Sequence, residues 1–193
     1  MQKFKPVILF VILLMTIFLF TNFARSENSD IVISEICPTG CADSGHQWLE
    51  IYNRGDEVVD MEGWTFFEND TNHGLDLSAS STQQDFLIES GEYAIIAQND
   101  LYFFADNPDV TSTVFDSSWG TLNKSGEHIT LKDGDDNILE DFSYLPINDF
   151  SLERKDLNQD DYSENNWLEH PNSHSAGQKN YYFFDSESSG GVE

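Results

Sequence analysis

Short apolar runs separated by turn residues make up most of the chain after residue 25. Several of them alternate between apolar and polar positions with a period of two, as half-buried β-strands do. The sustained spacing of three and four residues that indicates an amphipathic helix does not occur in this part of the sequence. The pattern predicts eight strands, at residues 31–36, 48–52, 64–67, 86–88, 93–97, 113–115, 128–131 and 138–144.

Turn residues separate these runs. Asp133-Gly134, between the last two runs, is the residue pair of a tight hairpin turn. The single helical candidate is residues 100–105, with Asn99 or Asp100 as its N-cap. Many short strands between turns predict an all-β fold, an antiparallel β-sandwich.

The apolar content also predicts how the chain is divided. The sandwich is expected at residues 29–145, and the irregular residues 146–180 are expected to form an extension packed on it. Residues 181–193 begin with four aromatic residues and become rich in serine and glycine, which predicts a flexible tail. The core is expected to draw on Trp48, Trp64, Phe66, Tyr93, Phe115 and Trp119, with Leu152, Trp167 and Leu168 from the extension.

Residues 1–25 have the layout of a secretory signal peptide. A short basic region is followed by an apolar run at residues 7–20, and a polar stretch then leads to the small residue Ala24. The apolar run is shorter than the roughly 20 residues that span a bilayer, although an uncleaved N-terminal anchor remains a second interpretation. Either interpretation places the rest of the chain outside the cytoplasm, in a periplasm, on a cell surface or in the medium.

Cys37 and Cys41 are the only cysteines and are separated by Pro-Thr-Gly. In an oxidising compartment this spacing predicts a disulfide bond across a turn. The alternative is half of a metal site, which would need further ligands, and no second cysteine pair exists. We expect the disulfide to contribute modestly to stability because the loop that it closes is short.

The net charge of the chain argues against two classes of binding partner. The chain has 35 acidic and nine basic side chains, and without residues 1–25 six bases remain against 35 acids, a net charge of −29. So negative a surface repels phosphate groups, which argues against nucleic-acid binding and against attraction to an anionic membrane. Membrane contact is expected only through an uncleaved N-terminal segment. An aromatic content of 13% and an apolar content of 39% argue against disorder.

Catalytic motifs are incomplete throughout the sequence. Glu50 shares a strand face with Trp48 and Tyr52, but glycoside hydrolysis needs two placed carboxyl groups, so Glu50 is expected to be a structural residue bonded to backbone or to Asn53. His170 and His174 are four residues apart, yet the intervening Pro171 prevents a helix that would align them. No serine lies in a nucleophile-elbow motif. We therefore expect no catalytic residues, no cofactor-binding residues and no enzymatic activity.

Calcium is the one cofactor that the sequence suggests. Asp156, Asn158 and Asp160 place oxygen ligands at alternate positions, as a calcium loop begins. The match then fails, because Asp161 stands where the loop needs glycine and Trp167 stands where it needs the closing glutamate. These residues are therefore a tentative calcium site, and solvated turn residues are the alternative.

Six segments, taken in order, resemble a bacterial lamin tail domain. They are Ile31-Val-Ile-Ser-Glu-Ile36, Gln47-Trp-Leu-Glu-Ile-Tyr-Asn53, Met61-Glu-Gly-Trp-Thr-Phe66, Ile88-Glu-Ser-Gly-Glu-Tyr-Ala-Ile-Ile-Ala97, Leu122-Asn-Lys-Ser-Gly-Glu-His-Ile-Thr-Leu131 and Ile138-Leu-Glu-Asp-Phe-Ser-Tyr144. Ser151-Leu-Glu-Arg154 and Asn166-Trp167 resemble the extension that follows the sandwich in many bacterial members. The resemblance covers about residues 29–180.

The resemblance implies an immunoglobulin-like β-sandwich and offers no catalytic residues. It implies an exported, non-enzymatic interaction or structural module that binds a protein or polysaccharide of the envelope or the extracellular space. The alternative is a calcium-dependent carbohydrate-binding or adhesion domain, which the acidic turns and the many aromatic residues favour.

Overall fold

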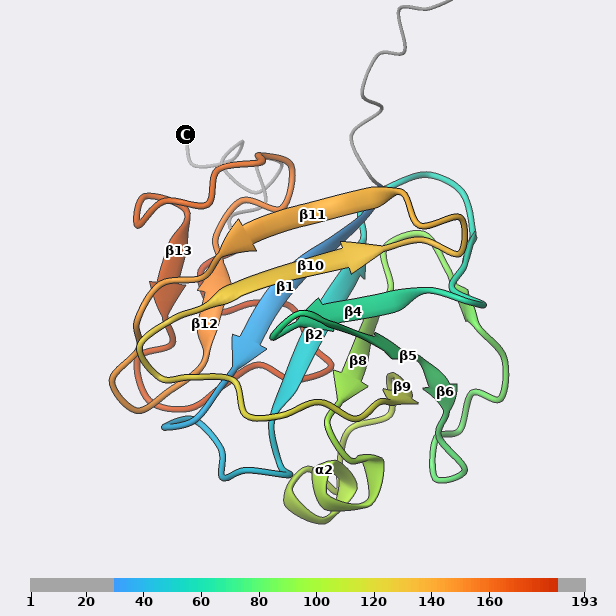
Figure 1. Cartoon of the computed structure of the whole chain (residues 1–193), viewed down its shortest axis with the longest axis horizontal. Helices are drawn as coiled ribbons and strands as arrows, with labels where there is room; N and C mark the ends of the chain where they lie inside the picture. The colour runs from blue at the N-terminus through green and yellow to red at the C-terminus, as the bar shows by residue number, and fades with distance from the viewer. Residues whose placement is uncertain (1–29, 184–193) are drawn as a thin grey trace, which may run out of the picture.

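The computed structural model describes residues 30–183, which fold into a β-sandwich with one short helix, α2 (Asp100–Asp106) (Figure 1). No helix within these residues is long and apolar enough to cross a membrane. The strands are β1 (Ile31–Cys37), β2 (Trp48–Asn53), β3 (Val59–Asp60), β4 (Thr65–Glu68), β5 (Thr71–Gly74), β6 (Asp76–Leu77), β7 (Leu87–Ile88), β8 (Tyr93–Ala97), β9 (Thr113–Asp116), β10 (His128–Lys132), β11 (Ile138–Ser143), β12 (Leu152–Arg154) and β13 (Trp167–Glu169).

Two sheets form the layers of the sandwich. The larger has seven strands in the order β13-β12-β1-β2-β8-β9-β6, and the smaller has four in the order β11-β10-β4-β5. A separate pair joins β3 to β7. Pairing is antiparallel except between β8 and β9, which are parallel because α2 crosses over between them.

The predicted elements are confirmed. All eight predicted strands are present within one or two residues of their expected bounds. The helix is present as well, with Asn99 as its N-cap accepting a hydrogen bond from the Tyr102 amide at 3.1 Å. In the hairpin between β10 and β11, the Asp133 carboxylate accepts amide hydrogen bonds from Asp135 and Asn137. The strands that the pattern did not predict, β3, β5, β6, β12 and β13, have two to four residues each, too few to show an alternation.

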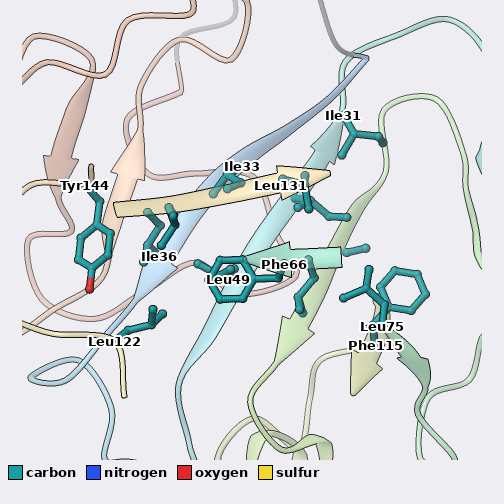
Figure 2. Packing of buried hydrophobic residues seen from close by; sticks show 14 of the residues in the cluster. Ile31, Ile33, Ile36, Leu49, Phe66, Leu75, Phe115, Leu122, Leu131 and Tyr144 are labelled. Carbon is teal, nitrogen blue, oxygen red and sulfur yellow. The ribbon is translucent and has the colours of Figure 1, made fainter. Parts of the chain in front are cut away.

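The main core lies between the two sheets (Figure 2). The larger sheet contributes Ile33 and Leu49 to it, and the smaller sheet contributes Phe66 and Leu131, all fully buried. Trp64, Phe115 and Trp119 also lie in this core, as predicted, together with Leu152 and Trp167 from the extension.

Two of the predicted core aromatics lie elsewhere. Leu49 and Ile51 of β2 point into the main core, so alternation directs Trp48 to the outer face of the larger sheet. There Trp48 packs in a second cluster that includes Phe103 of α2. By the same alternation Tyr93 of β8 faces outward, where it is only half-buried. The outer face of the larger sheet is therefore partly covered rather than left to solvent.

The extension enlarges the larger sheet. β12 pairs with β1 through Glu35 opposite Glu153 and Ile36 opposite Leu152, and β13 pairs with β12. The predicted signal peptide at residues 1–25 and most of the predicted tail lie outside the described residues.

Arg154 of β12 connects the extension to both sheets. Its side chain is fully buried, and Nη1 donates to Oε1 of Glu140 on β11 at 2.8 Å. The other oxygen of Glu140 accepts the backbone amide of Ile33 on β1 at 3.1 Å. Burial raises the pKa of the Glu140 carboxyl although Arg154 opposes this. The ion pair is thus a buried bridge between the two layers.

Removing the arginine alone is predicted to be costly. Arg154→Met leaves the Glu140 carboxylate buried without its cation, so the free energy of unfolding is expected to fall by about 3–5 kcal/mol. In the double variant with Glu140→Gln, the amide oxygen still accepts from Ile33 and no charge is left buried, so much of that loss is recovered. Urea denaturation followed by tryptophan fluorescence measures both variants, and equal losses would contradict the bridge.

Candidate functional site

A groove lies on the outer face of the larger sheet, next to the C-terminal end of α2. It consists of two adjoining hollows of about 440 Å³ and about 420 Å³ that share Asp106, Asn107 and His174. Three segments form its walls: the disulfide loop (residues 37–46), the end of α2 and the loop after it (residues 106–110), and residues 170–181. We call this hollow the groove.

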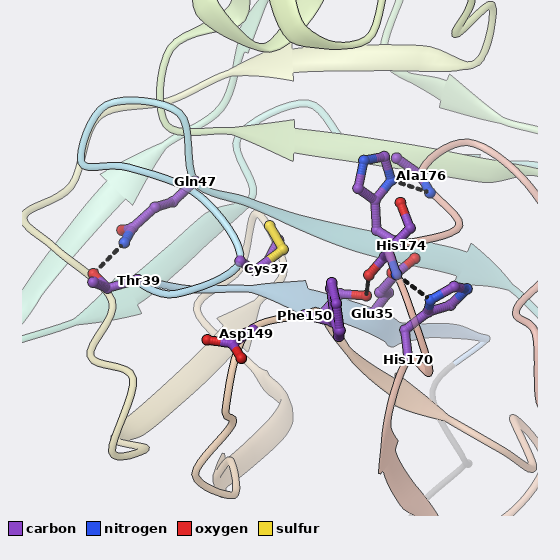
Figure 3. Close-up of a disulfide and its surroundings, with 12 residues drawn as sticks. Glu35, Cys37, Thr39, Gln47, Asp149, Phe150, His170, His174 and Ala176 are labelled. Carbon is purple, nitrogen blue, oxygen red and sulfur yellow. Dashed lines mark hydrogen bonds between the residues drawn. A yellow bond between two sulfur atoms is a disulfide. The ribbon is translucent and has the colours of Figure 1, made fainter.

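The disulfide loop forms the first wall. Cys37 and Cys41 are bonded, as predicted, with their Cα atoms 5.3 Å apart. The Pro38 carbonyl accepts the amides of Cys41 and Ala42, both at 3.1 Å, which closes the turn. Figure 3 shows the disulfide at the end of β1, on the same side of the sheet as Glu35, His170 and His174.

A histidine and an aspartate tie this loop to α2. Nδ1 of His46 lies 2.5 Å from Oδ2 of Asp106, and the ring of His46 stacks on Tyr102 with 4.6 Å between the centroids. Both His46 and Asp106 line the groove. The contact keeps the first two walls together.

His170 and His174, which the sequence places four residues apart, both line the groove although no helix aligns them. Nδ1 of His170 accepts the amides of Asn172 and Ser173, so this nitrogen carries no proton. The ring of His174 packs edge-on against Trp48 at 5.5 Å. Burial, with a smaller contribution from the charge of His170, lowers the pKa of His174 and favours its neutral form.

Three glutamates form a row beneath the third wall. Glu153 of β12 lies opposite Glu35 of β1, and Glu35 lies opposite Glu50 of β2. All three residues are fully buried, and none takes part in the salt bridges between residues 30 and 183. Like charges directly opposite each other on a sheet repel, so the arrangement is unfavourable when all three carboxyls are ionised. We call this row the carboxyl ladder.

The environment of the ladder favours protonated carboxyl groups. Burial is the main cause that raises the pKa of Glu35 from 4.5 to about 7; a hydrogen bond from Ser151 lowers it and the charge of Glu153 raises it. The pKa of Glu50 is raised well above its usual value, again mainly by burial and then by the charge of Glu35. At neutral pH the ladder therefore carries fewer than three negative charges.

Residues 173–181, the covering segment, lie over the ladder and bind it through their amides. The amides of Ser175, Gly177 and Tyr181 donate to Glu35, Glu50 and Glu153 at 3.0, 2.7 and 3.2 Å respectively. Gly177 has a φ of +71°, and a Cβ at this position would lie 2.8 Å from the Ser112 hydroxyl. The position therefore requires glycine, which allows the chain to approach the sheet closely.

Glu50, which the sequence predicts to be a structural residue, is thus part of the carboxyl ladder. Glu50 does bond to backbone, through Gly177, but Asn53 instead donates to the carbonyls of Glu57 and Ile88. Glu35 and Glu153 were not predicted. In the sequence, Glu35 stands out only as the one acidic residue among the mostly apolar residues of β1. This does not reveal that Glu50 and Glu153 lie beside it.

The tentative calcium residues, Asp156, Asn158 and Asp160, follow the C-terminal end of β12. Oδ1 of Asp160 accepts from Nη1 of Arg54 and from Nη2 of Arg154, both at 3.0 Å. The Asp156 carboxylate accepts from the Asn158 amide at 3.0 Å. Within residues 30–183, no group of three or more His, Cys, Asp or Glu side chains is arranged to hold a metal ion. Calcium binding here stays a prediction.

Comparison with known proteins identifies a family. A family model described as Lamin Tail Domain matches residues 24–145. This match contains β1 to β11 and ends before β12, so the extension and the covering segment lie beyond it. Neither the curated proteins nor the solved structures contain a match.

Calcium at Asp156, Asn158 and Asp160 would be detected by thermal melting. A ligand that binds only the native state raises the unfolding midpoint, so millimolar calcium is expected to raise it, and Asp156→Asn is expected to abolish the rise. An unchanged midpoint for the unsubstituted protein would contradict the site.

Reduction of the disulfide is predicted to lower stability modestly. The closed loop is short, so the free energy of unfolding should fall by about 2 kcal/mol. Chemical denaturation with and without reductant measures this, and the Cys37→Ala/Cys41→Ala double variant serves as a control that does not respond. A loss of twice this size would show that the disulfide holds more than its own loop.

Proposed function

The chain belongs to the lamin tail domain family, and from this premise we propose that it is an exported, non-enzymatic interaction module. The groove binds a protein or polysaccharide of the envelope or the extracellular space. Lamin tail domains are immunoglobulin-like domains, and the family is not one of enzymes. Function in such a fold depends on the surfaces that its loops present.

The observation that carries the proposal is the composition of the groove. Tyr181 lines it with 64% of its surface exposed, beside the polar side chains of Asn107, Asp109 and Gln178. An exposed aromatic ring next to hydrogen-bonding groups is typical of recognition sites, because the ring provides contact area and the polar groups provide orientation. The walls are held by the disulfide and by the bonds to the carboxyl ladder, so the site is formed before a partner arrives.

The chemistry around the groove supports binding rather than catalysis. The three carboxyls of the ladder are fully buried, so a substrate cannot reach them. His46 and Asp106 resemble part of a catalytic triad, but the hydrogen bonds within residues 30–183 give Nε2 of His46 no serine, threonine or cysteine partner.

Two features support an extracytoplasmic location and the class of partner. Disulfides such as Cys37–Cys41 persist in oxidising compartments, and the predicted signal peptide would direct the chain to one. The net charge of −29 beyond residue 25 disfavours nucleic acids as partners.

Substitutions in the groove are predicted to abolish partner capture. The purified protein is used to capture partners from envelope and extracellular extracts, and the captured components are quantified by mass spectrometry. Tyr181→Ala and Asp109→Lys are each expected to reduce the capture of a specific partner at least tenfold, because each alters a wall of the groove without touching the core.

Asp135→Lys is the matched control. It makes the same change of charge as Asp109→Lys, but at the exposed turn between β10 and β11 on the smaller sheet. It should leave capture unchanged. Retained capture by both groove variants would contradict the groove as the binding site, and robust hydrolysis abolished by one point substitution would contradict a non-enzymatic role.

Carbohydrate binding is the second candidate, and the exposed ring of Tyr181 favours it because aromatic rings pack against sugar faces. Screening the protein against immobilised glycans, with and without calcium, tests this candidate. Binding that Tyr181→Ala removes and Ile138→Ala retains would support it, since Ile138 of β11 is also exposed but lies outside the groove lining. Absence of binding to every glycan would leave a protein partner.

A further inference from the structure

The hydroxyl group of Ser175 lies between two carboxyl groups of the carboxyl ladder. Its Oγ lies 2.8 Å from an oxygen of Glu35 and 2.6 Å from an oxygen of Glu153, both within hydrogen-bond distance. A hydroxyl has one proton and can donate only one of these bonds. Both contacts are hydrogen bonds only in the arrangement in which a carboxyl group donates its own proton to Oγ, and burial raises the pKa of Glu35, which favours that arrangement.

Burial raises the pKa of Glu35 more than the hydrogen bonds from Ser151 and Ser175 lower it, so the net effect of its surroundings favours a retained proton. A bond from a protonated Glu35 to Ser175, and from Ser175 to Glu153, accounts for both distances. The second oxygen of Glu153 is buried and has no hydrogen-bond partner. If Glu35 and Glu153 were both ionised, the charge on this oxygen would lack solvation, which favours retention of one proton by the pair.

We propose that the carboxyl ladder is a pH-sensitive latch: its proton holds the covering segment against the sheet, and loss of the proton releases this segment. The covering segment forms one wall of the groove, so release also changes the groove. This effect on binding rests on the proposed function, whereas the movement of the segment does not.

Few other charges face the ladder. His170 stands just before the covering segment, and His174 and Lys179 are on it; all three line the groove. Burial lowers the pKa of His174, and Nδ1 of His170 accepts the amides of Asn172 and Ser173. Asp106 and Asp109 line the opposite wall of the groove. Below the ladder, Arg154 points to the other face of the sheet, toward Glu140.

Two tyrosines also lie near Glu153: Tyr181, whose amide donates to it, and Tyr182. The pKa of Tyr182 is raised by burial and then by the charge of Glu153, so Tyr182 stays neutral across the range in which the ladder titrates.

The direction of the pH effect follows from proton linkage. The closed segment binds the Glu35 proton more tightly than an open, solvated segment does, because the pKa of Glu35 is about 7 when closed against 4.5 for a solvated carboxyl. The closed form is therefore fully favoured below pH 4.5 and loses this advantage as pH rises toward about 7. This is the reverse of the behaviour of an acid that is stabilised by an ion pair.

Hydrogen–deuterium exchange of the full chain, without any ligand, tests the latch. The amides of Ser175 and Gly177 bind the ladder directly and report its state. Their protection, corrected for the intrinsic pH dependence of exchange, is expected to fall on the order of 100-fold between pH 4.5 and pH 7. Amides in β10 should show no comparable change.

Two single substitutions separate the latch from a general effect of pH. Glu35→Gln keeps the shape of the side chain but cannot lose the proton, so the fall in protection should be at least tenfold smaller. Glu68→Gln, which changes a buried glutamate of β4 outside the ladder, should retain the fall seen in the unsubstituted protein.

Constant protection of the covering segment across this pH range in the unsubstituted protein would overturn the proposal, even if a variant fails to fold. An unreduced fall in Glu35→Gln would overturn it as well. Either result would leave the groove as a binding site intact, whereas loss of that function in the capture experiment would leave the latch intact.

Discussion

Arg154 is the only lysine or arginine that is completely buried within residues 30–183, and the arrangement of the whole sandwich depends on where its charge is placed. Its guanidinium joins the larger sheet to Glu140 of the smaller sheet, and it also donates to the Gln159 carbonyl of the extension. Five glutamates are buried in the same region of the chain: Glu35, Glu50, Glu68, Glu140 and Glu153. One cation cannot neutralise five carboxyl groups, so the others must be held by amide and hydroxyl donors or keep their protons.

Neighbouring residues of β12 illustrate two ways to bury a carboxyl group: beside a cation, or with hydroxyl and amide donors and a retained proton. Arg154 points into the space between the sheets, where its partner is Glu140, and the next side chain, Glu153, points to the opposite face. There Glu153 meets Glu35 and the hydroxyl of Ser175, with no arginine within reach of the row. The first solution supplies a cation that keeps its charge at any ordinary pH. The second depends on a proton, and it is this face that carries the groove.

The fold was largely predictable from the sequence, whereas the site was predictable only in its local parts. Alternation within a strand is a local signal, and so are the cap of α2 and the cysteine spacing, so all three predictions were confirmed. Partners far apart in the chain leave no such signal: Ser175 lies 140 residues from Glu35, and Arg54 lies 106 residues from Asp160. For the same reason the acidic turn at residues 156–160 resembles a calcium loop in sequence, while in the structure one of its carboxylates already binds two guanidinium groups.

The family match ends at residue 145. This boundary cuts through both the buried ion pair and the carboxyl ladder, so each has residues on both sides of it. Glu35, Glu50 and Glu140 lie within the match, whereas Arg154, Glu153 and the covering segment lie beyond it. Without the extension, β1 would be an edge strand, and the carboxyls of Glu35 and Glu140 would lose the groups that now cover them. Solvated carboxylates on a sheet cost little, so the lamin tail sandwich alone has no need to manage their charge. The extension is therefore what converts ordinary acidic positions of the sandwich into a buried ion pair on one face and a proton-dependent contact on the other.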